Sequence, residues 1–165
     1  LECAFAWAQR ENRLPRCVVL VNLYGQSADM DALLPICERY GVPVLEDAAE
    51  SLGASYKGRA SGTFGRIGVF SPSYWIAPQA YDFEHTIRLP RGTRMYQSIG
   101  GREGGDTEHE ETVAKAVRME AQMRHDQPGL ALRAVVRPEA EHNEKAWRAE
   151  FPAAIRYLFG RLAGH

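Results

Sequence analysis

Residues 16–47 read RCVVLVNLYGQSADMDALLPICERYGVPVLED, and this stretch decides the fold. The run Cys17–Leu23 is apolar, which is typical of a strand covered on both faces. Asp29–Tyr40 has apolar residues at helical spacing and ends before Gly41, a good helix stop. Val42–Leu45 is a second short apolar strand. A strand, a helix and a strand joined by short loops predict parallel pairing with a right-handed crossover.

The same pattern continues on both sides of this unit. The sequence predicts an α/β fold, a three-layer sandwich with about five mainly parallel strands in the sequential order 1-2-3-4-5, packed as one domain. Successive crossovers place the intervening helices on one face, so the first and last helices are expected to cover the other. The further predicted segments are a helix at 3–12, a loop at 53–66, a strand at 67–71, an irregular stretch with a short helix at 72–94, a strand at 95–99, a helix at 107–125 with Val113, Ala116, Val117, Glu120 and Met123 facing inward, a strand at 130–136 and a helix at 144–162.

Composition and charge favour an ordinary soluble protein in the cytoplasm. Of the 165 residues 45% are hydrophobic and 25% charged, and the net charge is -1, so nothing indicates nucleic acid or an anionic membrane as a partner. No secretory leader is recognised, and the opening residue Leu1 suggests a fragment or a processed product. Three cysteines without metal spacing indicate buried thiols in a reducing compartment, so no metal site is predicted. A small-molecule substrate is expected if the chain is active, and the oligomeric state stays open.

Residues 1–65 resemble the DegT/StrS family of sugar-nucleotide aminotransferases, which use pyridoxal phosphate. The resemblance rests on VNLYGQSADMD at 21–31, ICERYGVPVLEDAAESLGA at 36–54 and YKGRASGTFG at 56–65. It implies that Asp47 faces the pyridine nitrogen of the cofactor, as a carboxylate must to keep that ring protonated. It also implies that Glu50 contacts the cofactor and that Ser71 holds its phosphate. This segment would then be part of the aminotransferase large domain.

One position departs from the aminotransferase pattern. The family has a lysine five residues after the phosphate-binding serine, where it forms the Schiff base, and this chain has Ile76. An isoleucine cannot form an imine, so covalent binding of pyridoxal phosphate is not expected. The three lysines of the chain lie in other contexts, at Lys57, Lys115 and Lys145.

Residues 64–165 resemble the C-terminal part of an esterase family of α/β hydrolases that includes enterochelin-esterase-like enzymes. The resemblance rests on FGRIGVFSPSYWIAP at 64–78, RMYQSIGGREG at 94–104 and VRPEAEHNEKAWRAEFPAAIRYLF at 136–159. It implies that Glu103 is the acid and His142 the histidine of a catalytic triad. The usual nucleophile elbow would lie upstream of these segments. Ser51, within AESLG at 49–53, matches a tolerated variant of that elbow and is the candidate nucleophile.

Neither resemblance brings a complete active site, and four functions stay open. The main interpretation is a catalytically incomplete composite, an esterase-like half joined to an aminotransferase-like half. The alternatives are an aminotransferase fragment that lacks the Schiff-base lysine, a weak ester hydrolase using Ser51, Glu103 and His142, and a non-catalytic binding protein. In the aminotransferase alternative, pyridoxal phosphate would bind non-covalently through Asp47 and Ser71.

Overall fold

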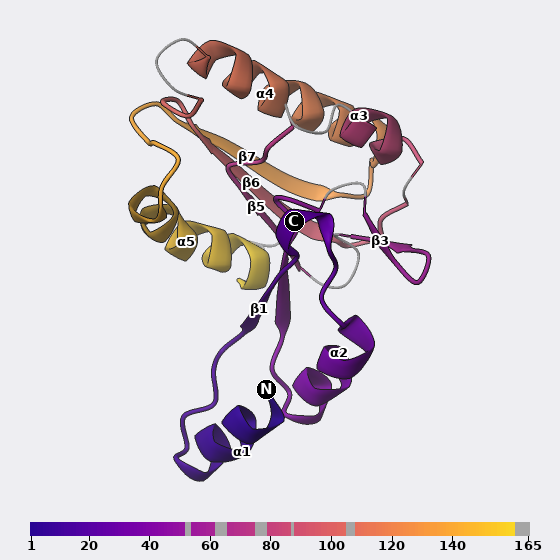
Figure 1. The fold of residues 1–165 in the computed structure, drawn as a ribbon, viewed down its shortest axis with the longest axis vertical. Helices are drawn as coiled ribbons and strands as arrows, with labels where there is room; N and C mark the ends of the chain where they lie inside the picture. Colours follow the sequence, from indigo (N-terminus) through magenta and orange to yellow (C-terminus); the bar gives the residue numbers. More distant parts are fainter. Residues whose placement is uncertain (52–53, 62–65, 75–78, 87, 105–107, 161–165) are drawn as a thin grey trace.

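A computed structural model describes residues 1–51, 54–61, 66–74, 79–86, 88–104 and 108–160. Within these ranges helices alternate with the strands of one parallel sheet (Figure 1). The elements are α1 (Glu2–Arg10), β1 (Val18–Val21), the short 3-10 helix η1 (Leu23–Gly25), α2 (Met30–Arg39), β2 (Val44–Asp47), β3 (Ser55–Tyr56), β4 (Arg59–Ala60), β5 (Arg66–Phe70), α3 (Gln79–Glu84), β6 (Arg94–Gly100), α4 (His109–Asp126), β7 (Ala131–Arg137) and α5 (Glu144–Phe159).

The main sheet has the order β1-β2-β5-β6-β7 with every pair parallel, which confirms the predicted α/β fold and sequential strand order. Its register places Val21 beside Asp47, and Asp47 beside Gly68. The carboxyl ends of β1, β2 and β5 therefore meet at one edge. Ligands of open parallel sheets bind at this edge.

Helices cover both faces of β5, β6 and β7 (Figure 1). On one face α4 packs over the sheet, and α3 lies beside α4. On the other face α5 buries Ala154 and Leu158 against Leu45 and Tyr96. The larger cluster, on the α4 side, is built from apolar side chains of the strands and of α4: Ile67, Val69, Met95, Ile99, Ala116, Met119, Met123 and Leu132.

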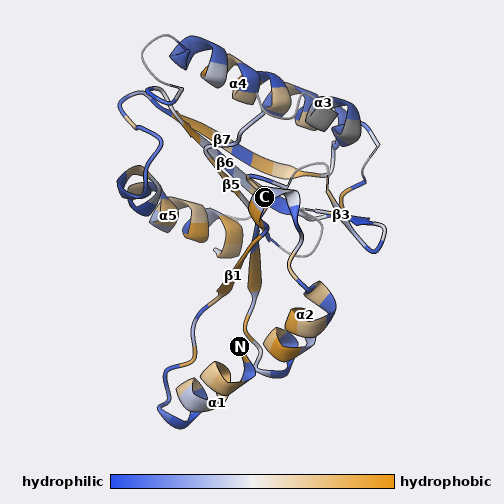
Figure 2. Ribbon diagram, in the orientation of Figure 1, coloured by the Kyte–Doolittle hydropathy of each residue, from blue (hydrophilic) through white to orange (hydrophobic). Residues whose placement is uncertain are grey.

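The expectation for the N-terminal helix was wrong. Instead of joining α5 on its face of the sheet, α1 packs against α2, with Phe5 buried beside Cys37 and the rings of Phe5 and Tyr40 5.0 Å apart. The α5 side of β1 is consequently left open. Val19 and Val21 are 40% and 54% exposed there, on a strand that is hydrophobic along its length (Figure 2).

Three local predictions also needed correction. The predicted loop at 53–66 contains a small antiparallel hairpin, β3–β4, that turns through Lys57 and Gly58 with positive φ. The strand predicted at 42–45 runs to Asp47, which is its last residue. The buried side of α4 consists of Thr112, Ala116, Met119 and Met123, whereas Val117 is 47% exposed. Among the described residues, none of the helices combines the length and apolar character required to cross a bilayer.

Candidate functional site

A pocket of about 600 Å³ opens at the carboxyl edge of β1, β2 and β5, beside the start of α5. Its walls are largely apolar, and four polar residues singled out in the sequence line it together: Asp47, Glu50, Ser71 and His142. The apolar lining includes Val21, Leu45, Phe70, Trp147 and Phe151. Residues assigned by the two resemblances thus share one pocket. Its volume and apolar walls are those of a small-molecule site.

Asp47 brings a carboxylate into this apolar surrounding. Burial raises the pKa of Asp47, a hydrogen bond from the backbone N–H of Ala49 (3.2 Å) opposes that rise, and the charge of Glu50 adds to it. The carboxyl group is therefore easier to protonate than an exposed one. A ligand that offers a positive charge or an N–H would stabilise its ionised form.

Glu50 shapes the rim of the pocket. Its Oε2 accepts a hydrogen bond of 2.9 Å from the backbone N–H of Tyr24, in the 3-10 turn that follows β1. Tyr24 has φ of 52°, a left-handed conformation that is unfavourable for a tyrosine. The carboxylate of Glu50 thus helps to hold this turn at the mouth of the pocket.

Ser71 follows β5 directly and is almost fully buried, at 4% exposure. Its hydroxyl donates to Oε1 of Glu103 (2.6 Å) and accepts from the indole N–H of Trp147 (2.7 Å). Its backbone N–H donates to the carbonyl of Ser98, and its φ is 53°. The left-handed backbone and both partners fix the hydroxyl against Glu103.

Glu103 and His142 are in contact, 39 residues apart in the chain. Nδ1 of His142 lies 3.1 Å from Oε2 of Glu103, whose side chain is 2% exposed, while the His142 side chain is 48% exposed. Oε1 of Glu103 also accepts from the backbone N–H of Gly100 (2.5 Å). The His142 ring meets Trp147 edge-on at 5.1 Å. With Nδ1–H directed at a carboxylate, Nε2 is the ring atom left to act on a ligand.

Ser51 does not join this pair. It is 1% exposed, does not line the pocket, and its hydroxyl shares a hydrogen bond of 2.5 Å with Ser61. Ser61 in turn donates to Glu46, which also accepts from Asn22. The structure therefore places the candidate nucleophile in a separate buried polar cluster. Leu52 and Gly53, the next residues of the presumed elbow, lie outside the described residues.

Trp147 is the residue whose role the sequence did not reveal. It lies in the first turn of α5, where its indole N–H donates to the hydroxyl of Ser71 and its ring packs edge-on against His142. The spacing of His142, Asn143 and Trp147 was the available signal. Asn143 caps α5 by accepting from the backbone N–H of Ala146, which fixes the direction in which the helix starts.

These residues fit pyridoxal phosphate only in part. Asp47 suits a ring nitrogen, and the pocket can hold an aromatic ring. The phosphate end does not fit, because the hydroxyl of Ser71 is directed at Glu103, whose carboxylate would repel a phosphate. Ile76, which stands where the Schiff-base lysine is required, lies outside the described residues.

Comparison with known proteins supports the first resemblance. Residues 8–72 match the DegT/DnrJ/EryC1/StrS aminotransferase family. The match includes Asp47, Glu50 and Ser71, and it ends just after β5. Strands β1, β2 and β5 and one side of the pocket therefore lie in the segment that resembles the aminotransferases.

Individual relatives agree. EpsN of Bacillus subtilis (strain 168), named as a pyridoxal phosphate-dependent aminotransferase, is 62% identical over 71 residues, which are 43% of this chain and 18% of EpsN. The UDP-2-acetamido-2-deoxy-3-oxo-D-glucuronate aminotransferase of Pseudomonas aeruginosa is 56% identical over 46 residues, 28% of this chain and 13% of that enzyme. The L-glutamine:2-deoxy-scyllo-inosose aminotransferase of Micromonospora echinospora is 50% identical over 54 residues, 33% of this chain and 13% of that enzyme.

The chain thus spans less than a fifth of the length of these relatives. The comparisons lend no support to the esterase resemblance of residues 64–165 or to a composite chain. Both stay predictions from the sequence.

Proposed function

We propose that this chain carries the ring-binding part of the cofactor site of a pyridoxal phosphate-dependent sugar aminotransferase, and that it holds a pyridine-type ring without covalent capture. The observation that carries the proposal is the position of Asp47. It is the last residue of a parallel strand, lines an apolar pocket, and stands within a segment matching the aminotransferase family.

The electrostatics of the pocket support a ring with a basic nitrogen. A carboxylate surrounded by apolar groups has lost much of its hydration, and a cation beside it offsets the free energy lost with that hydration. A protonated pyridine nitrogen provides the charge and an N–H donor together. Phe70 and Trp147 supply aromatic walls against which a flat ring packs.

Transamination is not expected from this chain alone. The position of the imine-forming lysine holds Ile76, and Ser71 is engaged by Glu103 and Trp147. The bound ring would exchange freely with solvent.

Pyridoxine tests the proposal, because it has the ring nitrogen but lacks the aldehyde that would react with the three lysines. We expect saturable binding of pyridoxine, measured by its fluorescence. Asp47→Asn should weaken this binding at least about tenfold, because one hydrogen bond to a charged group is lost. Asp82→Asn, an exposed acid on α3, is the matched control and should bind as the parent does. Equal affinity of Asp47→Asn and the parent would refute the proposal, as would absence of binding to the parent chain.

The contact between Glu103 and His142 favours a second candidate function, hydrolysis of an activated ester. A buried carboxylate that orients Nδ1–H leaves Nε2 to accept a proton from the attacking group. Because the Ser51 hydroxyl is hydrogen-bonded to Ser61, we propose water as that group. Its oxygen adds to the ester carbonyl while its proton passes to Nε2 of His142. The bond to the alcohol oxygen then breaks as Nε2 returns that proton to it, which gives the acid and the alcohol.

The hydrolysis of p-nitrophenyl acetate separates the alternatives. Water attack predicts that His142→Ala removes turnover, that Ser51→Ala retains it, and that no acyl-enzyme burst occurs. Loss of turnover in Ser51→Ala with a burst in the parent would instead identify Ser51 as the nucleophile. A parent chain that hydrolyses the ester no faster than His142→Ala has no such activity.

A further inference from the structure

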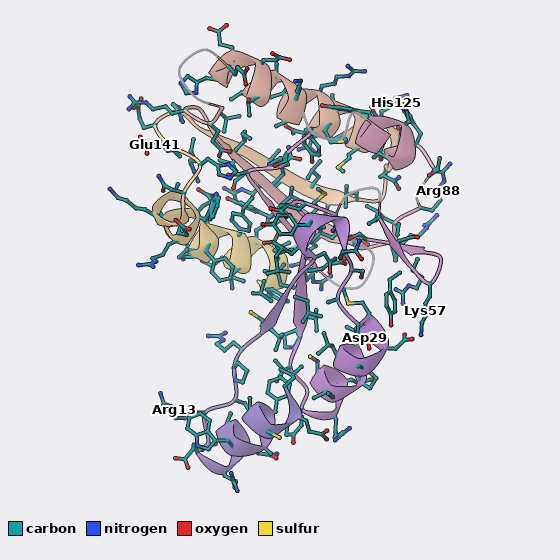
Figure 3. The ribbon with its side chains drawn as sticks, viewed as in Figure 1. Arg13, Asp29, Lys57, Arg88, His125 and Glu141 are labelled. Carbon is teal, nitrogen blue, oxygen red and sulfur yellow. The ribbon has the colours of Figure 1, made fainter. Side chains whose placement is uncertain are left out.

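Three side chains of types that bind metal ions lie together where α3 and α4 both end, outside the pocket described above. Glu84 is the last residue of α3, His85 follows it, and Asp126 is the last residue of α4. One ligand atom from each lies within 4.8 Å of the others. His125, labelled in Figure 3, marks this meeting point of the two helices.

Glu84 is held in place from two sides. Its side chain is buried, at 2% exposure, and both carboxylate oxygens accept amide hydrogen bonds. Nε2 of Gln122 donates to Oε2 at 3.1 Å, and Nε2 of Gln127 donates to Oε1 at 3.3 Å. Neutral amides orient this carboxylate without cancelling its charge, as the outer partners of metal ligands do.

Asp126 has one oxygen that the protein leaves unsatisfied. Its Oδ1 pairs with Nδ1 of His125 at 2.7 Å. Its Oδ2 is buried and accepts no hydrogen bond from the described residues, although Nδ1 of His85 lies 2.5 Å away. The nitrogen and the oxygen thus converge on one place at ion-pair distance, although their geometry is not that of a hydrogen bond.

The surroundings favour a cation. Two carboxylates within 4.8 Å of each other repel, and α3 and α4 both direct their negative C-terminal ends at the cluster. Among the described residues, those beside the cluster that can carry a positive charge include His85, His125 and Arg88, and Arg88 donates to the backbone carbonyl of His85. The two imidazole rings offset the negative charge of the carboxylates and helix ends only when they are protonated.

We propose that Glu84, His85 and Asp126 bind a divalent transition-metal ion. Imidazole nitrogen with carboxylate oxygens is a donor set that Zn²⁺ accepts, and three protein ligands leave a position for water. Ligand distances of about 2.0 Å place neighbouring donor atoms about 3.3 Å apart in a tetrahedral site, so His85 must retreat by about 1 Å. Its side chain is 57% exposed and can do so. The ion would join the ends of α3 and α4.

Zinc titrated into the full chain tests the site. We expect one Zn²⁺ per chain by calorimetry and a higher Tm with Zn²⁺ than with a chelator. The visible spectrum of bound Co²⁺ should indicate four- or five-fold coordination. His85→Ala and Glu84→Gln should each weaken binding by at least about tenfold. His85 is exposed, so its removal tests the site even if Glu84→Gln does not fold.

His125→Ala is the matched control, because this histidine pairs with the other oxygen of Asp126. It should retain Zn²⁺ affinity within about threefold, well below the effect of losing a ligand. Unchanged affinity in His85→Ala, or an equal loss in His125→Ala, would overturn the assignment. Failure of the parent chain to bind Zn²⁺ would overturn it too.

Discussion

The hydroxyl of Ser71 donates a hydrogen bond of 2.6 Å to Oε1 of Glu103, from inside the aminotransferase-like segment to a residue beyond it. Trp147, from α5, donates to the same hydroxyl. The serine that the family resemblance assigns to the cofactor phosphate is therefore tied to a carboxylate. This hydrogen bond connects the aminotransferase-like segment to the part of the chain that follows it. It also makes the pocket less suitable for a ligand with a phosphate.

The first prediction is that a phosphate adds nothing to ligand affinity. Pyridoxine 5′-phosphate should bind no more than about threefold more tightly than pyridoxine, because Glu103 stands beside the serine and repels the phosphate. Fluorescence titration of both compounds measures this. An affinity gain of tenfold or more for the phosphate, abolished by Ser71→Ala, would show that Ser71 does hold the group.

As a corollary of the first prediction, Ser71→Ala should lower the stability of the fold. It leaves Oε1 of Glu103 with one donor fewer and the indole N–H of Trp147 without its acceptor, at a cost of about 1–3 kcal/mol in urea unfolding. Ser73→Ala changes another serine that lines the pocket and serves as control, with an expected effect below about 0.5 kcal/mol.

The sheet could be predicted from the sequence because each strand is a short apolar run between helices, and sequential right-handed crossovers leave few topologies. The position of α1 could not. Its apolar residues suit any apolar surface, and in the structure Phe5 packs against Cys37 of α2 and against Tyr40, which follows α2. Helical periodicity shows that a helix has a buried side, but not which partner buries it.

The site was predictable only where a residue follows a strand. Asp47 ends β2, Ser71 follows β5, His142 lies between β7 and α5, and all three line one pocket. The bonds that decide their chemistry were not visible in the sequence. Whether Ser51 faces His142 or Ser61 depends on the path of the chain after β2, and whether Glu84 meets Asp126 depends on how α3 packs on α4.

The second prediction concerns Gly101, which allows the connection from β7 to α5 to lie against the end of β6. A Cβ added at Gly101 would come within 2.6 Å of the carbonyl oxygen of Pro138 and 2.8 Å of its Cα, and both are backbone atoms. Gly101→Ala should therefore cost about 1–3 kcal/mol of unfolding free energy. It should also displace the loop that brings His142 to Glu103.

Nitrogen NMR of the His142 ring reads this displacement directly, through loss of the signal of a hydrogen-bonded Nδ1–H. Gly129→Ala is the control, since a Cβ there meets nothing within 4 Å. An alanine at position 101 that leaves both stability and the His142 signal unchanged would contradict the steric argument.

The third prediction is acid-dependent stability from Glu150. Hydrogen bonds from Arg137 lower the pKa of Glu150 against the effect of its burial, and Tyr96 also donates to it. The stabilisation is present above the unfolded pKa of 4.5 and is lost as pH falls through the lower folded value. Glu150→Gln should cost about 1.5–3 kcal/mol at pH 7, the range for hydrogen bonds to a charged group.

The difference between Glu150→Gln and the parent should shrink as the pH of urea unfolding is lowered from 7 towards 3. Glu38→Gln, at an exposed position of α2, should change stability by less than about 0.5 kcal/mol at either pH. A difference that stays constant with pH would mean that the charge of Glu150 does not contribute.

The last prediction reverses this sign at Asp47. Burial raises the pKa of Asp47 in the folded protein above its ordinary value of 3.8, so its ionisation weakens the fold. Its contribution is favourable below the unfolded pKa and is lost as pH rises through the folded one. Asn keeps an oxygen for the N–H of Ala49 without the charge, so Asp47→Asn should be more stable than the parent at pH 7, and this gain should disappear near pH 3. Urea unfolding at both pH values measures it, with Asp82→Asn as the neutral control. Pyridoxine at the same concentration should then stabilise the parent more than Asp47→Asn, because only the parent offers a carboxylate to the ring nitrogen. An Asp47→Asn variant less stable than the parent at pH 7 would mean that the carboxylate serves the fold and not a ligand.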